Sequence, residues 1–351
     1  MAAISTPPGG ALSGGGLLPN WAPYAVFLAS TALVSAVLAA AGSFSIGLML
    51  LFGVLVSCVG IYVWSRTVEG SRRAVDRTMT MAIAAAFALA MIPLASLLFE
   101  VIKRGVPGLS WEFLTEDARG VINGGGAAHA LVGTLVITGV ATVISVPIGI
   151  MAAIYLTEYG DGKLRRALTF FVDVMTGIPS IVAGLFAYAL FELFLGPGIR
   201  LGVMGSAALA LLMIPIVIRS AEEVLKIVPN HLREAAYALG TPKWKTITKI
   251  VLPTAFAGLV TGVMLAVARI IGETAPLLVT TGVIDSINSN PFQGRMQNLA
   301  VYAYSEYRSP GIDKAASYDR AWAAALLLIA IVMILNVVAR MVYRRYKTEI
   351  R

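Results

Sequence analysis

Two oppositely charged residues lie four positions apart inside a long apolar stretch. Arg269 and Glu273 interrupt residues 254–283, close to the middle of a membrane-length segment. A charge in such a segment costs roughly 2.5–3.5 kcal/mol on insertion scales, so it points to a function. At i and i+4 the two side chains share a helix face. Two interpretations stay open: an ion pair that fixes helix packing, or a guanidinium that binds a tetrahedral oxyanion such as phosphate while the carboxylate orients it.

Three other charges lie inside apolar segments but nearer to their ends. Arg219 is close to a cytoplasmic end and has the length to snorkel to water, so position alone leaves its role open. Asp173 and Glu192 lie near opposite ends of one segment, and we interpret both as wetted termini. These three charges are therefore weaker indications of a site than Arg269 and Glu273.

Glycine and proline mark two places where a spanning helix is expected to bend. Gly177 and Pro179 interrupt an apolar run and indicate either a gate hinge or a kink tolerated against a neighbouring helix. Pro276 removes a helical hydrogen bond just beyond Glu273, which predicts a local bend there. All three are candidates for a gate or hinge.

The elements that hold these residues are those of a membrane protein. Of the 351 residues, 58% are hydrophobic and 13% charged, against roughly 45–50% and about 25% in soluble domains. The sequence predicts an all-α polytopic protein with about eight spanning helices, each near the roughly 20 residues that a span requires. The first two segments read as two spans or a re-entrant hairpin, and we favour two spans. The segments are about 24–41, 46–64, 79–99, 128–157, 167–195, 204–222, 254–283 and 321–343.

Basic residues set the orientation. The loops at 64–78, 158–166 and 223–250, with the tail after 343, hold sixteen lysines and arginines, whereas the opposite loops hold eight. The positive-inside rule therefore places both termini and the 223–250 loop in the cytoplasm of a multi-pass protein. The net charge of +8 records this orientation rather than nucleic-acid binding.

The chain divides into four parts in this interpretation. Residues 1–23 contain no charged side chain, which predicts a disordered cytoplasmic tail and argues against a signal peptide. Residues 24–78 form an extra N-terminal transmembrane pair with a basic cytoplasmic loop. Residues 79–345 form a six-span core, and residues 346–351 a second cytoplasmic tail.

The charged loop between the sixth and seventh segments has its own helical pattern. Asn230 is expected to cap a short helix that ends at Gly240, and Thr241 with Pro242 is expected to start a second one. Trp244, Ile247 and Val251 are expected to share a face of the second helix. The apolar side of this helix–turn–helix has no bilayer to cover it and predicts a protein partner. On the first helix the apolar positions are Leu232, Ala235, Ala236 and Leu239.

The same loop resembles the EAA loop of type I ABC importer permeases. Glu234, Ala235 and Ala236, then Gly240, then Leu252-Pro253 occur at the spacing of that motif. The resemblance implies a coupling loop, residues 223–253, that docks in a groove of a cytoplasmic ATPase. It implies ATPase-coupling roles for Arg233, Glu234, Ala235, Ala236, Leu239, Gly240 and Trp244.

Further stretches narrow the resemblance to PstA-type permeases of the bacterial phosphate importer. These are Pro215–Glu222, Arg233–Lys245 and Ala268–Leu278. The resemblance implies that Arg219, Arg269, Glu273 and Thr274 lie on the substrate path in a bacterial plasma membrane. It implies a homologous PstC-like permease, two copies of a PstB-like ATPase that binds ATP and Mg, and a PstS-like extracytoplasmic phosphate-binding protein as partners.

Several other functions fit the sequence less well. No G-x-x-x-x-G-K-[ST] stretch occurs, so the chain is not expected to hydrolyse ATP or to bind a cofactor, and His129 and His231 are too far apart for a metal motif. The nearest alternative is the same architecture for sulfate, molybdate or a phosphonate. A secondary transporter working alone would have no use for a docking loop. An enzyme acting on lipid phosphates would need a nucleophile or base beside its arginines, and none is visible.

Overall fold

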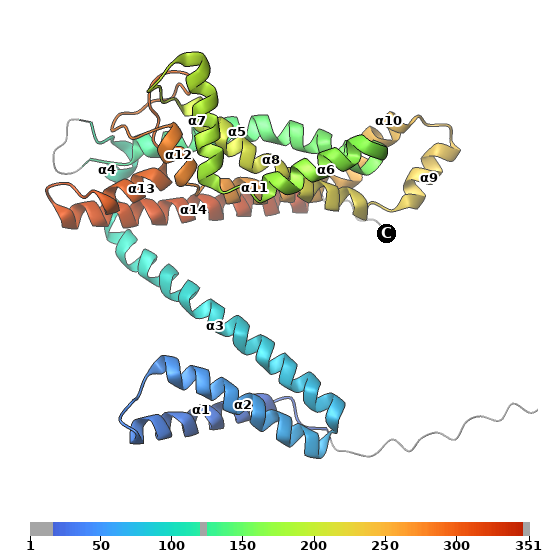
Figure 1. The fold of residues 1–351 in the computed structure, drawn as a ribbon, viewed down its shortest axis with the longest axis vertical. Helices are drawn as coiled ribbons and strands as arrows, with labels where there is room; N and C mark the ends of the chain where they lie inside the picture. Colours follow the sequence, from blue (N-terminus) through green and yellow to red (C-terminus); the bar gives the residue numbers. More distant parts are fainter. Residues whose placement is uncertain (1–16, 120–124, 347–351) are drawn as a thin grey trace, which may run out of the picture. The chain divides into compact units, whose positions relative to one another are not determined.

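The computed structural model describes residues 17–119 and 125–346, and two compact units divide the chain at residues 98 and 99 (Figure 1). The described residues form helices joined by turns and loops, which confirms the predicted all-α class. Of the two predicted cytoplasmic tails, residues 1–16 and 347–351 lie outside the described part.

The first unit contains a helical hairpin. Helices α1 (Ala22–Ala40) and α2 (Ile46–Val68) run side by side, joined by a turn in which Gly42 has φ +66°. Gly53 allows the close approach, because a Cβ there would lie 2.6 Å from Cγ2 of Thr31. Both helices have the length and composition of membrane spans, as expected for two spans rather than a re-entrant hairpin.

Helix α3 (Ser71–Gly108) is one continuous helix of 38 residues that begins in the first unit and ends in the second. The proposed domain boundary at residue 79 therefore falls inside a helix. The assignment of residues 79–345 to a functional core stays a prediction.

Helix α8 (Gly202–Ile227) is at the centre of the second unit. It packs against α5 (Ala128–Ile154) and α11 (Leu252–Ile270), and α11 also packs against α14 (Lys314–Tyr346). The contacts are close because small residues line them. A Cβ on Gly149 of α5 would lie 2.6 Å from Cγ1 of Val217 on α8.

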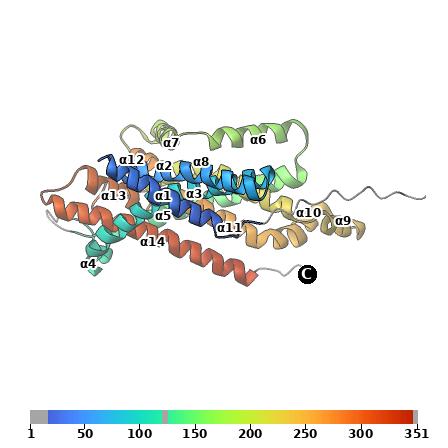
Figure 2. The same ribbon diagram turned by 90° about the horizontal axis from the view of Figure 1, so that it is seen from below.

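The two ends of this bundle carry different elements. In Figures 1 and 2, one end carries the short helices α9 and α10, and α14 ends on that side. The other end carries α4, α13 and the long connections. The bounds of the remaining elements are α4 Trp111–Thr115, π-helical turn η1 Tyr155–Tyr159, α9 Asn230–Ala238, α10 Lys243–Thr246, π-helical turn η2 Ile247–Val251, α12 Ala275–Thr280 and α13 Leu299–Arg308.

The predicted span at 167–195 is sharply bent, at the place that Gly177 and Pro179 indicated. Helices α6 (Gly162–Thr176) and α7 (Ser180–Leu195) meet at an angle of 108°. The break coincides with Gly177 and Pro179, because a proline cannot donate to the preceding turn. Within the described ranges, seven helices are long and apolar enough to cross a membrane, and this bent pair makes an eighth if it is one span.

The predicted span at 254–283 also ends early. Helix α11 stops at Ile270, and residues 271–274 separate it from α12, in whose first turn Pro276 lies. A proline suits the first turn of a helix because its missing N–H would have no partner there. The predicted bend is therefore a complete break between two helices.

Candidate functional site

The 223–253 loop presents apolar side chains at its tip. The side chain of Leu239 is 85% exposed and that of Trp244 is 62% exposed, while Ala235 is also exposed. Gly240 has φ +73°, a conformation that costs other residues about 1–2 kcal/mol, and it ends the turn after α9 as predicted. These side chains form an uncovered apolar surface on α9 and α10, which lie at one end of the bundle (Figure 2).

The other predicted apolar positions of the first helix, Leu232 and Ala236, face the interior of the second unit. Ala236 is buried, and Leu232 packs against the cluster that contains Val228 and Val251. The prediction that Trp244 shares a face with Ile247 and Val251 is wrong, because the latter two are buried and Trp244 is not. The loop therefore has one side against its own unit and one side free.

Both helix starts differ from the prediction by one residue: α9 starts one residue earlier, and α10 one residue later. Pro229 rather than Asn230 precedes the first turn of α9, and Pro242 rather than Thr241 precedes that of α10. Neither helix has a side-chain cap; the amide oxygen of Asn230 instead accepts a hydrogen bond from Arg233. A proline directly before a helix has a fixed φ angle, so the chain direction at the start of the helix is set even though no side chain caps it.

The second helix of the loop is not a separate element. Lys243 to Ile270 form one continuous run, α10, η2 and α11, that passes from the loop into the membrane-length helix. Arg269 is in the last turn of that run. The exposed Trp244 and the charged Arg269 thus belong to one continuous helical run.

Arg269 and Glu273 form the predicted ion pair through Nη1 and Oε1. The side chain of Arg269 is 64% exposed, whereas that of Glu273 is 12% exposed. The pair lies at the end of α11, where the chain breaks before α12. Thr274 is half-buried, precedes α12 directly, and its carbonyl accepts the amide of Leu278 at 3.0 Å.

Arg219 joins a network of four charged side chains. It pairs with Asp173 of α6 and with Glu222 at 2.9 Å, and Glu222 pairs with Lys226 at 2.7 Å. Asp173 and Glu222 also line a shallow cleft of about 630 Å³ beside Arg165 and Arg166. Sequence reasoning treated Asp173 as an isolated terminus. Arg219 and Asp173 carry opposite charges and lie near the same predicted membrane boundary, and this could have predicted their contact.

The predicted hinge residues lie at two breaks that are close to each other in space. Gly177 and Pro179 occupy the α6–α7 bend, and Pro276 begins α12. Helices α7 and α12 pack together at Gly184, where a Cβ would lie 2.6 Å from Cα of Pro276. The gating role of these residues stays a prediction.

Arg233 points into the protein. Its guanidinium donates to Glu158 at 2.7 Å and to the carbonyl oxygen of Val228 at 2.6 Å. Glu234 beside it is exposed. The two neighbours therefore occupy opposite sides of α9, one facing η1 and one facing outward.

No cluster of three histidine, cysteine, aspartate or glutamate side chains suited to a metal ion occurs in residues 17–119 and 125–346. The described site contains arginines with their carboxylate partners and an exposed apolar surface.

Sequence comparison relates the chain to membrane components of transport systems. Residues 145–350 match the family described as binding-protein-dependent transport system inner membrane component. The chain is 46% identical over 277 residues to the phosphate transport system permease protein PstA 1 of Mycobacterium tuberculosis (strain CDC 1551 / Oshkosh), covering 77% of this chain and 89% of the relative. It is 41% identical to PstA of Pasteurella multocida, covering 70% and 86%.

Solved structures with the same fold are more distant in sequence. A chain of the MetNI methionine ABC transporter in an inward-facing conformation aligns with TM-score 0.53 and 21% identity, covering 63% of this chain and 96% of that one. A chain of a bacterial alginate ABC transporter aligns with TM-score 0.57 and 13% identity, covering 78% and 96%. These likenesses establish a fold shared with ABC transporter chains.

Proposed function

The chain belongs to the binding-protein-dependent transport system inner membrane components, among the PstA permeases, and from that premise we propose that it is the permease subunit of an ATP-driven importer of inorganic phosphate. In this role the chain forms part of the path, and a partner ATPase hydrolyses ATP with Mg.

The observation that carries the proposal is the exposure of Arg269. Its helix begins at Leu252, next to Pro253, and about 24 Å of helix separates Pro253 from Arg269. That height lies within a hydrocarbon core of about 30 Å. A charged side chain at such a depth faces a water-filled cavity or another protein chain rather than lipid. The 64% exposure of Arg269 therefore supports a path shared with a second, homologous permease.

The geometry of the pair suits an oxyanion. A guanidinium offers a planar fork of donors that matches a phosphate edge, and its carboxylate partner holds it in place when no anion is bound. Arg219, paired with Asp173 and Glu222, would be a second anion-binding position nearer the cytoplasm. Thr274, at the break beside Glu273, has a hydroxyl that would add a donor.

The uncovered surface at Leu239 and Trp244 would dock the ATPase. The continuous run from Lys243 to Ile270 would then transmit its movement to Arg269, because an unbroken helix moves as a rigid element. Two ATPase copies would serve the two permeases, and a phosphate-binding protein would deliver the anion to the opposite face.

The same arrangement supports the proposed orientation. Helix α14 ends on the side of the bundle that carries α9 and α10 (Figure 1), and basic residues are concentrated in the loops of that side. The positive-inside rule then puts the coupling loop, residues 223–253, and both termini in the cytoplasm of a bacterial cell.

The test replaces both members of the pair. If Arg269 only neutralises Glu273, the variant Arg269→Leu/Glu273→Leu keeps transport, because removing both members of an ion pair together leaves no unpaired charge behind. If Arg269 binds the anion, phosphate uptake is abolished while the complex still assembles and retains its ATPase in a pull-down. Arg269→Lys keeps the charge, loses the fork and transports poorly.

A matched control is available in the same unit. Glu100 and Arg104 form another ion pair at i and i+4 on α3, and their double replacement with leucine should leave uptake near normal. Near-normal uptake by the assembled Arg269/Glu273 variant would refute the proposed role of the pair. Competition of phosphate uptake by sulfate or molybdate, at concentrations where phosphate competes, would assign a different oxyanion.

A further inference from the structure

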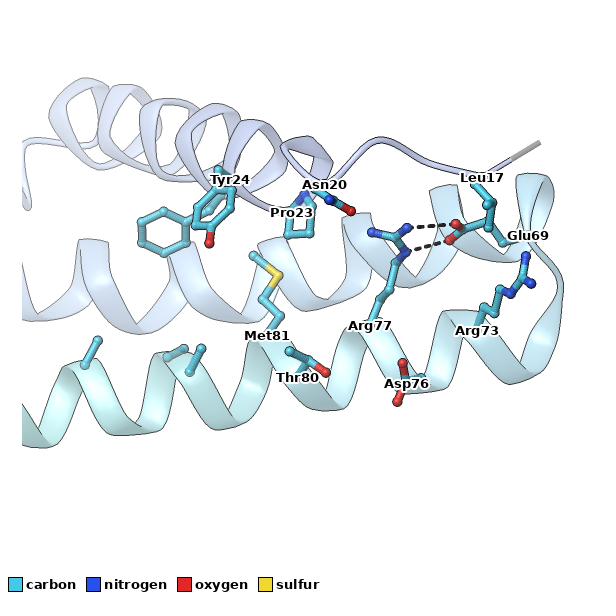
Figure 3. A pocket seen from close by; sticks show the side chains of 14 residues that line it. Leu17, Asn20, Pro23, Tyr24, Glu69, Arg73, Asp76, Arg77, Thr80 and Met81 are labelled. Carbon is cyan, nitrogen blue, oxygen red and sulfur yellow. Dashed lines mark hydrogen bonds and ion pairs between the residues drawn. The ribbon is translucent and has the colours of Figure 1, made fainter. Parts of the chain in front are cut away.

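A groove runs between α1 and α3 within the first unit, and Figure 3 shows the side chains along it. Its volume is about 790 Å³, within the range of roughly 300–1,000 Å³ that small-molecule sites occupy. Phe27 and Tyr24 line it from α1, and Met81, Ala85 and Ala88 line it from α3. Most of the wall is therefore apolar, and both helices are long and apolar enough to cross a membrane.

One end of the groove is closed by a fixed ion pair. The carboxylate of Glu69 is fully buried and accepts two bonds from Arg77, at 2.7 and 2.8 Å. It also accepts the backbone amide of Leu18 at 2.8 Å. The Arg77 guanidinium is the main cause that lowers the pKa of Glu69 to about 2. Neither charge of this pair is available to a ligand, so the pair shapes the groove instead.

Two further charges line the same end and lack such partners. Arg73 and Asp76 both face the groove, and neither makes a hydrogen bond or ion pair with any residue in 17–119 or 125–346. They are three positions apart and therefore neighbours on one face of α3. The groove thus offers one cation and one anion at its end, and its apolar side chains, such as Met81, lie further along α3 (Figure 3).

We propose that this groove binds one phospholipid whose headgroup carries a primary ammonium, such as phosphatidylethanolamine. The lipid phosphate contacts Arg73, the ammonium contacts Asp76, and one acyl chain lies along Met81, Ala85 and Ala88. The dimensions agree, because Thr80 to Ala88 spans about 12 Å of helix and half of the hydrocarbon core is about 15 Å.

The charges favour this headgroup over others. A purely anionic headgroup would satisfy Arg73 and leave Asp76 facing a negative charge. A choline headgroup has no N–H to donate to the carboxylate of Asp76. Residues 1–16 of the chain contain no charged side chain and so offer neither group an ionic side-chain partner. A zwitterion with donor hydrogens satisfies the two together.

The experiment uses the full-length chain in its assembled transporter, reconstituted in nanodiscs. Phosphatidylethanolamine, phosphatidylcholine and phosphatidylglycerol are compared, each with the same photoactivatable acyl chain, and labelled peptides are mapped by mass spectrometry. We expect phosphatidylethanolamine to label the segments around Phe27 and Met81–Ala88 most strongly. Arg73→Ala should reduce that labelling roughly fivefold, since one arginine near a lipid surface contributes about 1 kcal/mol.

Three variants separate a specific site from bulk lipid. Asp76→Asn should remove the preference for phosphatidylethanolamine over phosphatidylcholine. Ala85→Phe should fill the groove and abolish labelling by every lipid. Arg72→Ala is the matched control, because Arg72 is exposed and does not line the groove, and it should change nothing. All four variants retain Glu69 and Arg77, so an unchanged melting temperature confirms the fold.

Other outcomes would overturn the proposal. Equal labelling by the three lipids, or labelling that Arg73→Ala and Asp76→Asn leave unchanged, would mean that bulk lipid fills the groove. Stronger labelling by phosphatidylglycerol would assign an anionic lipid instead. Increased labelling on deletion of residues 2–16 would show that the N-terminal segment of the chain itself occupies the groove.

Discussion

Arg233 and Glu158, 75 residues apart in the sequence, form a nearly buried ion pair that fastens the coupling loop to the π-helical turn η1. Both Nε and Nη2 of Arg233 donate to one oxygen of Glu158, at 3.1 and 2.7 Å. The same guanidinium donates to the carbonyl oxygens of Val228 and Leu225 at the end of α8. A single side chain thus ties three segments together behind the surface that is proposed to dock the ATPase.

Replacing Arg233 should destabilise the protein more than replacing its exposed neighbour. Arg233→Ala leaves a carboxylate that is 6% exposed without a partner, and breaking a buried pair costs roughly 3–5 kcal/mol. Glu234→Ala should cost within about 0.5 kcal/mol, because Glu234 is exposed. Thermal unfolding of the purified chain in detergent compares the two. Equal stabilities would mean that Arg233 acts only through contact with a partner.

Gly240 should tolerate substitutions according to backbone conformation rather than size. A Cβ on Gly240 would meet no atom within 4 Å, but φ is +73°. Asparagine enters this left-handed region with little cost, whereas a β-branched residue is strained. Gly240→Asn should therefore retain ATPase in a pull-down, and Gly240→Val should lose most of it while inserting normally. Equal loss with both residues would indicate that side-chain bulk clashes with the partner.

The loop and its turn were predictable because their signals are local. Gly240 stands where a helix must stop, and Leu239 interrupts a charged segment with an apolar side chain. Spacing could not tell which apolar residues face inward, because α9 is amphipathic toward two different surfaces. Ala236 packs on its own unit while Leu239 faces outward, and only the placement of α8 and η1 separates them.

The two helix breaks were harder to predict for a different reason. Glycine and proline predicted a bend in each of residues 167–195 and 254–283, but each range has the length of one span, so the sequence did not show that the first turns by 108° or that the helix stops completely in the second. The Arg219–Asp173 contact likewise joins residues 46 positions apart on different helices. Such contacts depend on how helices pack together, which the periodicity of a sequence does not predict.

The orientation of the chain can be tested with an impermeant thiol reagent. Single cysteines at Arg72 and Lys243, in a Cys58→Ser background, should resist labelling in intact cells, because basic loops are retained in the cytoplasm. Both positions are exposed, so permeabilised cells should label readily and provide the control. Labelling of either cysteine in intact cells would reverse the proposed topology.

The last prediction concerns the continuous helical run between the docking surface and Arg269. Thr248 and Lys249 are exposed residues of η2, so substituting them disturbs the helix without removing a buried contact. Glycine at both positions weakens the helix by about 1 kcal/mol each relative to alanine. Thr248→Gly/Lys249→Gly should keep the ATPase bound but lower phosphate uptake per ATP hydrolysed. The matched Thr248→Ala/Lys249→Ala variant should transport normally, because alanine preserves the helix. If both variants transport alike, movement does not reach Arg269 through α10, η2 and α11, and coupling must run through another contact of α9, such as the one that Arg233 makes with Glu158.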